Sequence, residues 1–231
     1  MHKKSILACG KALALLLAVY MPTFALVSAL LMSAGTPAPP DASVIAAALP
    51  LVTGISLVIT VILIALIGRR QFRSYGFRLP PGRTLLYSLA LGLGIGFALR
   101  WLVWSFGIQE PSMFTGLATW QVIAFFWVGA PVQEEIIFRG LFQTTLEKDT
   151  PTVFPVGRWN LSVASLCSAV VFSLVHLGLL SVGASWEATA FVGASALLLG
   201  ILAGQFRWRT GSLVPGILIH AMFNVAGSIW P

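Results

Sequence analysis

Uninterrupted apolar runs of about twenty residues recur along almost the whole chain and limit its folding more than any other feature. A run of that length lets an α-helix cross the hydrocarbon core of a bilayer. Inside that core every backbone N–H and C=O must find its partner within the protein, which favours helices. Hydrophobic residues make up 58% of the chain and charged residues only 9%. We therefore expect an all-α fold, a polytopic transmembrane helix bundle in which residues 1–231 form a single integral membrane domain.

About seven spans are predicted from the apolar runs and from the turns and charges between them. Residues 1–115 hold the first spans and carry no specific motif, whereas residues 116–231 hold the polar motifs described below. Gly92 and Gly96 form a GxxxG pattern, which indicates close packing of two membrane helices. The spans are expected at residues 9–32, 43–67, 84–106, 118–146, 161–180, 187–205 and 211–229.

The formal net charge of +7 raises the question of a nucleic-acid partner, but the distribution of charge argues against one. With seven spans all the basic loop residues fall on one side, while Asp41, Glu110 and Glu187 lie on the other. By the positive-inside rule the N-terminus is cytoplasmic. The expected partner is therefore the lipid bilayer, with no nucleic acid. The basic loop residues are Lys3, Lys4, Lys11, Arg69, Arg70, Arg73, Arg78, Arg83, Lys148, Arg158, Arg207 and Arg209.

A few ionisable residues remain inside the spans. Each charged side chain placed mid-membrane costs about 2.5–3.5 kcal/mol on insertion scales, so such residues usually mark a site. Arg100 does not need a functional role to explain it, because it lies beside Trp101 near the end of a span and could pair with Glu110. The others are Glu134, Glu135, Arg139, His176 and His220.

The stretch APVQEEIIFRG places two glutamates and an arginine in one apolar span. Glu135 and Arg139 are four residues apart, so in a helix they can form an ion pair. Glu134 points about 100° away and is left without that partner. Pro131 is expected to kink the helix and to free the carbonyl of Trp127. The pattern indicates either a structural Glu–Arg clamp or a carboxylate facing a polar cavity.

Two further polar groups lie on later spans. His176 follows Phe172 by one turn in VVFSLVHLG, and by itself it could be a satisfied core histidine. His220 and Asn224 share one helix face in HAMFN, where they could also be a hydrogen-bonded packing pair. Together with Glu134 they supply a carboxylate, two imidazoles and a carboxamide from three helices. This combination favours hydrolysis by an activated water inside the membrane.

The chemistry leaves two ways to activate that water. Glu134, His176 and His220 match a catalytic Zn²⁺ set in which the fourth position stays open for water. A metal-free glutamate–histidine couple would serve as well. In either case Asn224 could donate a hydrogen bond to the oxyanion of a tetrahedral intermediate.

These motifs resemble those of a known family. EEIIFR resembles the EExxxR motif, FSLVH the FxxxH motif and HAMFN the HxxxN motif of the CPBP intramembrane metalloproteases. That family is also called the Abi, or CAAX-protease and bacteriocin-processing, family. The similar region runs from about Trp120 to Ile229.

The resemblance implies an endopeptidase that acts on membrane-associated protein or peptide substrates. Glu134 would be the general base, with His176 as its partner. His220 and Asn224 would bind the metal, Zn²⁺, or stabilise the oxyanion. The remaining motif residues, Glu135, Arg139 and Phe172, would support them. Relatives cut prenylated CAAX proteins or process bacteriocins, and the expected location is the bacterial cytoplasmic membrane.

Two other classes of function compete with this interpretation. A proton-coupled transporter would use the same residues as a proton relay, but it predicts internal repeats that the sequence does not show. A non-catalytic membrane scaffold or bacteriocin-immunity partner would use them only to hold helices together. It predicts that Glu134→Gln keeps the biological activity.

Overall fold

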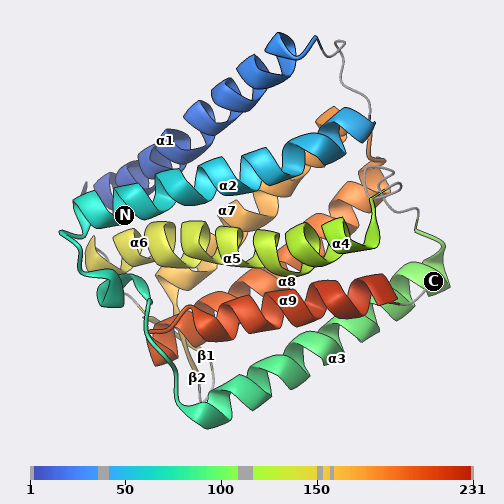
Figure 1. The fold of residues 1–231 in the computed structure, drawn as a ribbon. Helices are drawn as coiled ribbons and strands as arrows, with labels where there is room; N and C mark the ends of the chain where they lie inside the picture. The colour runs from blue at the N-terminus through green and yellow to red at the C-terminus, as the bar shows by residue number, and fades with distance from the viewer. Residues whose placement is uncertain (1–2, 36–41, 109–116, 150–152, 157–158, 230–231) are drawn as a thin grey trace.

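The computed structural model describes residues 3–35, 42–108, 117–149, 153–156 and 159–229, and it is the expected all-α bundle (Figure 1). One span is a continuous composite helix. It consists of α4 (Thr119–Gln121), η3 (Val122–Gly129), α5 (Ala130–Glu135), η4 (Ile136–Gln143) and α6 (Thr144–Asp149). The other long helices are α1 (Lys3–Ser33), α2 (Ala42–Ile67), α3 (Gly82–Phe106), α7 (Val163–Val175), α8 (Trp186–Thr210) and α9 (Val214–Ile229).

Every predicted span corresponds to a helical segment of the structure. Among the described residues, five helices are long and apolar enough to cross a membrane, whereas the apolar stretch of α9, Val214–Ser228, is shorter. The chain is therefore an integral membrane protein. The count of seven spans and the cytoplasmic N-terminus stay predictions. Three of the charged loop residues, Asp41, Glu110 and Arg158, lie outside the described residues.

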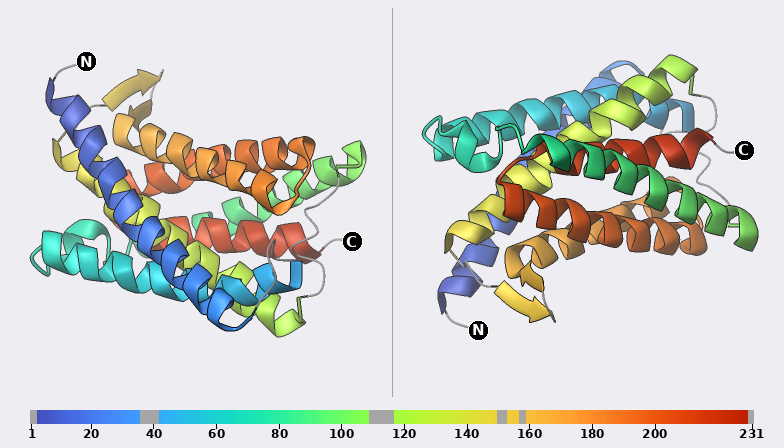
Figure 2. Two further views of the ribbon diagram at one scale, coloured as in Figure 1. Left: turned by 90° about the horizontal axis from the view of Figure 1, so that it is seen from above. Right: turned by 90° about the horizontal axis from the view of Figure 1, so that it is seen from below.

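Helix α1 shows how the apolar segments divide between core and lipid. Its buried side chains recur at the three- and four-residue spacing of one helix face. That face packs on α2 and on the composite helix, and Figure 2 shows α1 lying across the latter. The opposite face exposes large apolar side chains, as suits a surface covered by lipid. The buried face comprises Ala8, Ala12, Leu16, Val19, Thr23 and Val27.

The connections that carry the arginines meet at one end of the bundle. The short helix η1 (Phe72–Tyr75) follows α2, and Arg207 Nη2 donates to the Ser74 carbonyl at 3.0 Å. Arg78 Nη2 donates to the carbonyl of Thr210, the last residue of α8, at 2.6 Å. The α2–α3 connection therefore lies against the α8–α9 turn.

The connection after α6 contains a feature that the sequence did not reveal. β1 (Val153–Val156) pairs with β2 (Trp159–Ser162) in an antiparallel hairpin. Gln205 of α8 donates from Nε2 to the Asn160 carbonyl at 2.6 Å, which ties the hairpin to the bundle.

Helix α3 packs mainly along α9 through the predicted GxxxG pattern (Figure 1). A Cβ atom at Gly92 would overlap the Ile219 carbonyl oxygen, and one at Gly96 would lie 2.6 Å from the Ala226 Cβ. Both glycines are buried, and the absence of side chains lets the two backbones approach closely. The predicted close packing is confirmed, and its partner is the helix that carries His220 and Asn224.

Candidate active site

The composite helix is wound unusually where it carries its motif. η3 and η4 are π-helical, with hydrogen bonds that reach back five residues, and such segments are frequent at functional sites. The Ala130 N–H bonds to the Phe125 carbonyl. Asn224 Nδ2 donates to the Phe126 carbonyl at 2.8 Å, so the π-helical segment η3 is bonded to α9.

That Pro131 frees the carbonyl of Trp127 stays a prediction. Asn224 is 6% exposed, and one hydrogen of its carboxamide joins α9 to η3. An amide NH₂ has two donor hydrogens, so the second is available to a ligand.

The predicted Glu135–Arg139 ion pair is confirmed. Arg139 Nη1 lies 2.9 Å from Glu135 Oε1, and the two side chains are 1% and 0% exposed. The Arg139 guanidinium also lies over the Phe172 ring, 4.5 Å from its centroid. In the described part of the chain, Glu135 Oε2 and Arg139 Nε and Nη2 are buried without a hydrogen-bond partner. The cluster thus holds unused hydrogen-bonding capacity deep in the bundle.

His220 lies between the two glutamates. Its Nδ1 is 3.3 Å from Glu135 Oε1, and its Nε2 is 3.7 Å from Glu134 Oε2. Because an ionised carboxylate only accepts hydrogen bonds, Nδ1 carries the proton toward Glu135. Glu135 therefore orients the imidazole, with its Nε2 toward Glu134. The Glu134 side chain is 25% exposed, unlike fully buried Glu135, so Glu134 is the carboxylate with an open face.

His176 lies at the end of α7 and has a different set of neighbours. Its Nδ1 is 2.8 Å from the Phe172 carbonyl, which only accepts, so Nδ1 carries a proton and donates to that oxygen. The Phe172 ring packs edge-on against both imidazoles, 4.9 Å from His176 and 5.9 Å from His220. Among the described residues, no carboxylate lies within ion-pair distance of His176. Its pairing with Glu134 stays a prediction.

The predicted zinc ligands do not form a ligand set in this arrangement. Within the described ranges no three His, Cys, Asp or Glu side chains gather as a metal site. Both ring nitrogens of His220 face carboxylate oxygens, and one ring nitrogen of His176 faces a carbonyl. Zn²⁺ binding by Glu134, His176 and His220 stays a prediction.

Sequence reasoning missed several neighbours of the site. Tyr20 of α1 lies close to the Gln133 side chain and to Glu134, and nothing in the first hundred residues had indicated this. A Cβ at Gly216 would lie 2.8 Å from Glu135 Oε2, and one at Gly200 would lie 2.9 Å from Arg139 Nη2. These glycines make room for the buried ion pair. Gly216 directly follows a proline just before the HAMFN motif, a position that could have drawn attention to it.

The bundle thus holds a partly exposed glutamate beside a histidine, with an asparagine one turn further along the same helix as that histidine. Residues 116–226 match the model of the family described as type II CAAX prenyl endopeptidase Rce1-like. The match covers the motif-bearing part of the chain and is consistent with the CPBP resemblance. Neither the comparison with curated proteins nor the comparison with solved structures gave a match.

Proposed function

We propose that the protein is an intramembrane endopeptidase that hydrolyses membrane-associated proteins or peptides with a water activated by Glu134. The observation that carries this proposal is the contrast between the two glutamates. Glu135 is buried and bonded to Arg139 and His220, whereas Glu134 is partly exposed and faces His220 Nε2. Glu134 is therefore the carboxylate available to act as a base.

The side chains support a balanced sequence of steps. Glu134 takes a proton from water while the water oxygen bonds to the peptide carbonyl carbon. The negative charge that forms on the carbonyl oxygen is met by the second amide hydrogen of Asn224. The C–N bond then breaks, and Glu134 returns the proton to the leaving nitrogen. The lone pair of His176 Nε2 can accept a hydrogen bond from the attacking water.

Glu135 and Arg139 act through His220 in this scheme. The ion pair fixes Glu135, and Glu135 fixes the imidazole, as a carboxylate orients histidine in other hydrolases. The other nitrogen of His220, Nε2, faces Glu134 Oε2 at 3.7 Å and can accept a hydrogen bond from that carboxyl once it has taken up the proton. We assign Glu135 and Arg139 as positioning residues and Glu134 as a catalytic residue.

The proposed location is the bacterial cytoplasmic membrane, and the proposed substrates are membrane-associated proteins or leader peptides. The long apolar helices support a substrate that reaches the site from within or along the bilayer. Bacteriocin precursors and CAAX-type proteins are both compatible with such access.

The test uses the purified protein in liposomes with a library of fluorogenic peptides carrying a lipid anchor. Glu134→Gln is nearly isosteric and removes the base, so we expect cleavage to fall by about 10²-fold or more. Glu187→Gln, at an exposed carboxylate at the start of α8, is the matched control and should cleave normally. Full activity in folded Glu134→Gln would falsify the mechanism. Uptake into the liposomes that depends on Glu134 would favour the transporter instead.

A further inference from the structure

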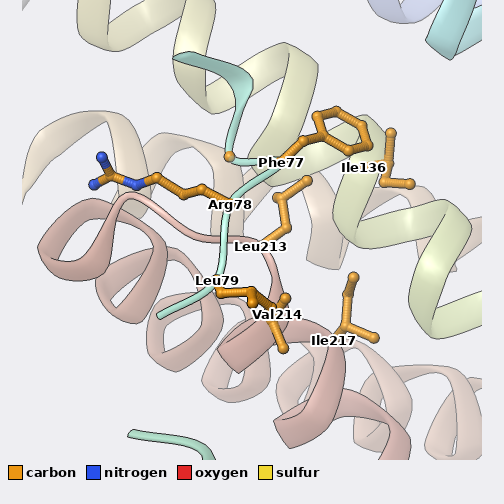
Figure 3. A pocket seen from close by; sticks show the side chains of 8 residues that line it. Phe77, Arg78, Leu79, Ile136, Leu213, Val214 and Ile217 are labelled. Atoms are coloured by element: carbon orange, nitrogen blue, oxygen red, sulfur yellow. The ribbon is translucent and has the colours of Figure 1, made fainter. Parts of the chain in front are cut away.

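An apolar pocket opens at the arginine-bearing end of the bundle (Figure 3). Its volume is about 340 Å³, and nearly all of its lining is apolar. The Leu213 N–H donates to the Gly76 carbonyl at 2.9 Å, which holds the α2–α3 connection against the start of α9 and closes one side. The pocket is lined by Gly76, Phe77, Arg78, Leu79, Ile136, Leu213, Val214 and Ile217.

A second hollow, of about 550 Å³, adjoins the first. The two share Phe77, Arg78 and Leu79, and the second adds Arg73 and Thr210. In Figure 3 the Arg78 guanidinium points away from the apolar side chains, so the charge lies at the rim. The combined site therefore has an apolar floor and a cationic edge.

The exposed residues at this rim suit a boundary between lipid and water. Leu79 is 85% exposed and Phe77 is 37% exposed, although both are apolar. Arg73 and Arg78 are exposed beside them. Apolar side chains next to cationic ones are favoured where acyl chains meet charged headgroups.

We propose that the two hollows together bind one anionic phospholipid. The phosphate would pair with Arg73 and Arg78, and part of an acyl chain would lie in the apolar pocket against Leu213 and Ile217. Arg78 already donates one hydrogen bond to the Thr210 carbonyl, but a guanidinium has five N–H donors, so it can bind phosphate without releasing α8. The positive rim selects an anionic headgroup over a zwitterionic one.

The proposed lipid would adjoin the candidate active site. Ile136 directly follows Glu135 in the chain, and Ile217 precedes His220 by almost one turn of α9. A bound chain that contacts both isoleucines would hold η4 and α9 together at the level of these two site residues. The proposal does not depend on proteolysis, because lipid binding is a property of the resting protein.

The experiment is a lipid titration of delipidated, detergent-purified protein followed by native mass spectrometry. Wild type should bind dioleoyl-phosphatidylglycerol at least about fivefold more tightly than dioleoyl-phosphatidylcholine, and Arg73→Gln should lose about fivefold in affinity for the former. Arg83→Gln removes the same charge from an exposed arginine at the same end that lines neither hollow, and it should bind like wild type. Glycerol phosphate should not compete, because it lacks the acyl chain.

Two results would overturn the proposal. Equal affinity for phosphatidylglycerol and phosphatidylcholine would show that the site does not select an anionic headgroup. An equal loss in Arg83→Gln and Arg73→Gln would show that the basic surface attracts lipid without a defined site. Arg78→Gln also loses the bond to α8, so Arg73→Gln and a pocket-filling Val214→Phe variant carry the test. Val214→Phe should weaken phosphatidylglycerol binding while its elution profile stays that of the wild type.

Discussion

Two ion pairs of nearly equal length allow the effect of burial to be measured directly. Arg139 Nη1 and Glu135 Oε1 are 2.9 Å apart with both side chains buried, and Lys11 Nζ and Asp149 Oδ2 are 3.0 Å apart with side chains 53% and 36% exposed. Replacing Arg139 by Met keeps most of the volume and leaves the Glu135 carboxylate without its cation. Removing one partner of a buried pair costs about 3–5 kcal/mol, whereas an exposed pair contributes about 0–1 kcal/mol.

We expect Arg139→Met to fall near the lower end of that range, at about 3 kcal/mol, because His220 Nδ1 still faces Glu135. Lys11→Met should cost less than about 1 kcal/mol. Arg139→Met/Glu135→Leu should recover part of the loss, since no unpaired charge then remains buried. The assay is equilibrium unfolding in mixed micelles titrated with a denaturing detergent. Equal losses for Arg139→Met and Lys11→Met, or a double variant weaker than Arg139→Met, would refute the reasoning.

Two other predictions concern helix packing and the metal. Gly92→Ala should separate α3 from α9 and lower the thermal stability in detergent. Gly94→Ala lies in the same helix with nothing within 4 Å of the new Cβ, so it should melt like the wild type. Equal melting temperatures of the two variants would contradict the packing argument. If the zinc prediction from the sequence is right, mass spectrometry of the purified protein should find about one Zn²⁺ per chain. The ion should be lost in His176→Ala and in His220→Ala. Metal-free wild type that still cleaves peptides would show that prediction to be wrong.

Local properties of the sequence were sufficient for much of the structure. The apolar runs of the sequence located the helical segments, because the thickness of a bilayer sets how many apolar residues a spanning helix needs. The four-residue spacing gave the Glu135–Arg139 pair, and the GxxxG pattern gave the contact of α3. Each of these follows from one helix and its periodicity alone.

The remaining features depend on how helices are placed against each other. The sequence could not show that His220 lies between Glu134 and Glu135, because the heights of α9 and the composite helix are set by packing along their whole lengths. The contact of Tyr20 with Gln133 joins segments more than a hundred residues apart and has no local pattern. π-Helical winding also escaped prediction, since the residues of η3 would suit an α-helix equally well.

The bond from Asn224 to the Phe126 carbonyl couples the orientation of one side chain of α9 to the backbone of η3. Because the acceptor is a main-chain oxygen, a substitution of the Phe126 side chain leaves it in place, whereas a movement of η3 relative to α9 turns the carboxamide. The orientation of Asn224 therefore follows the relative position of the two helices.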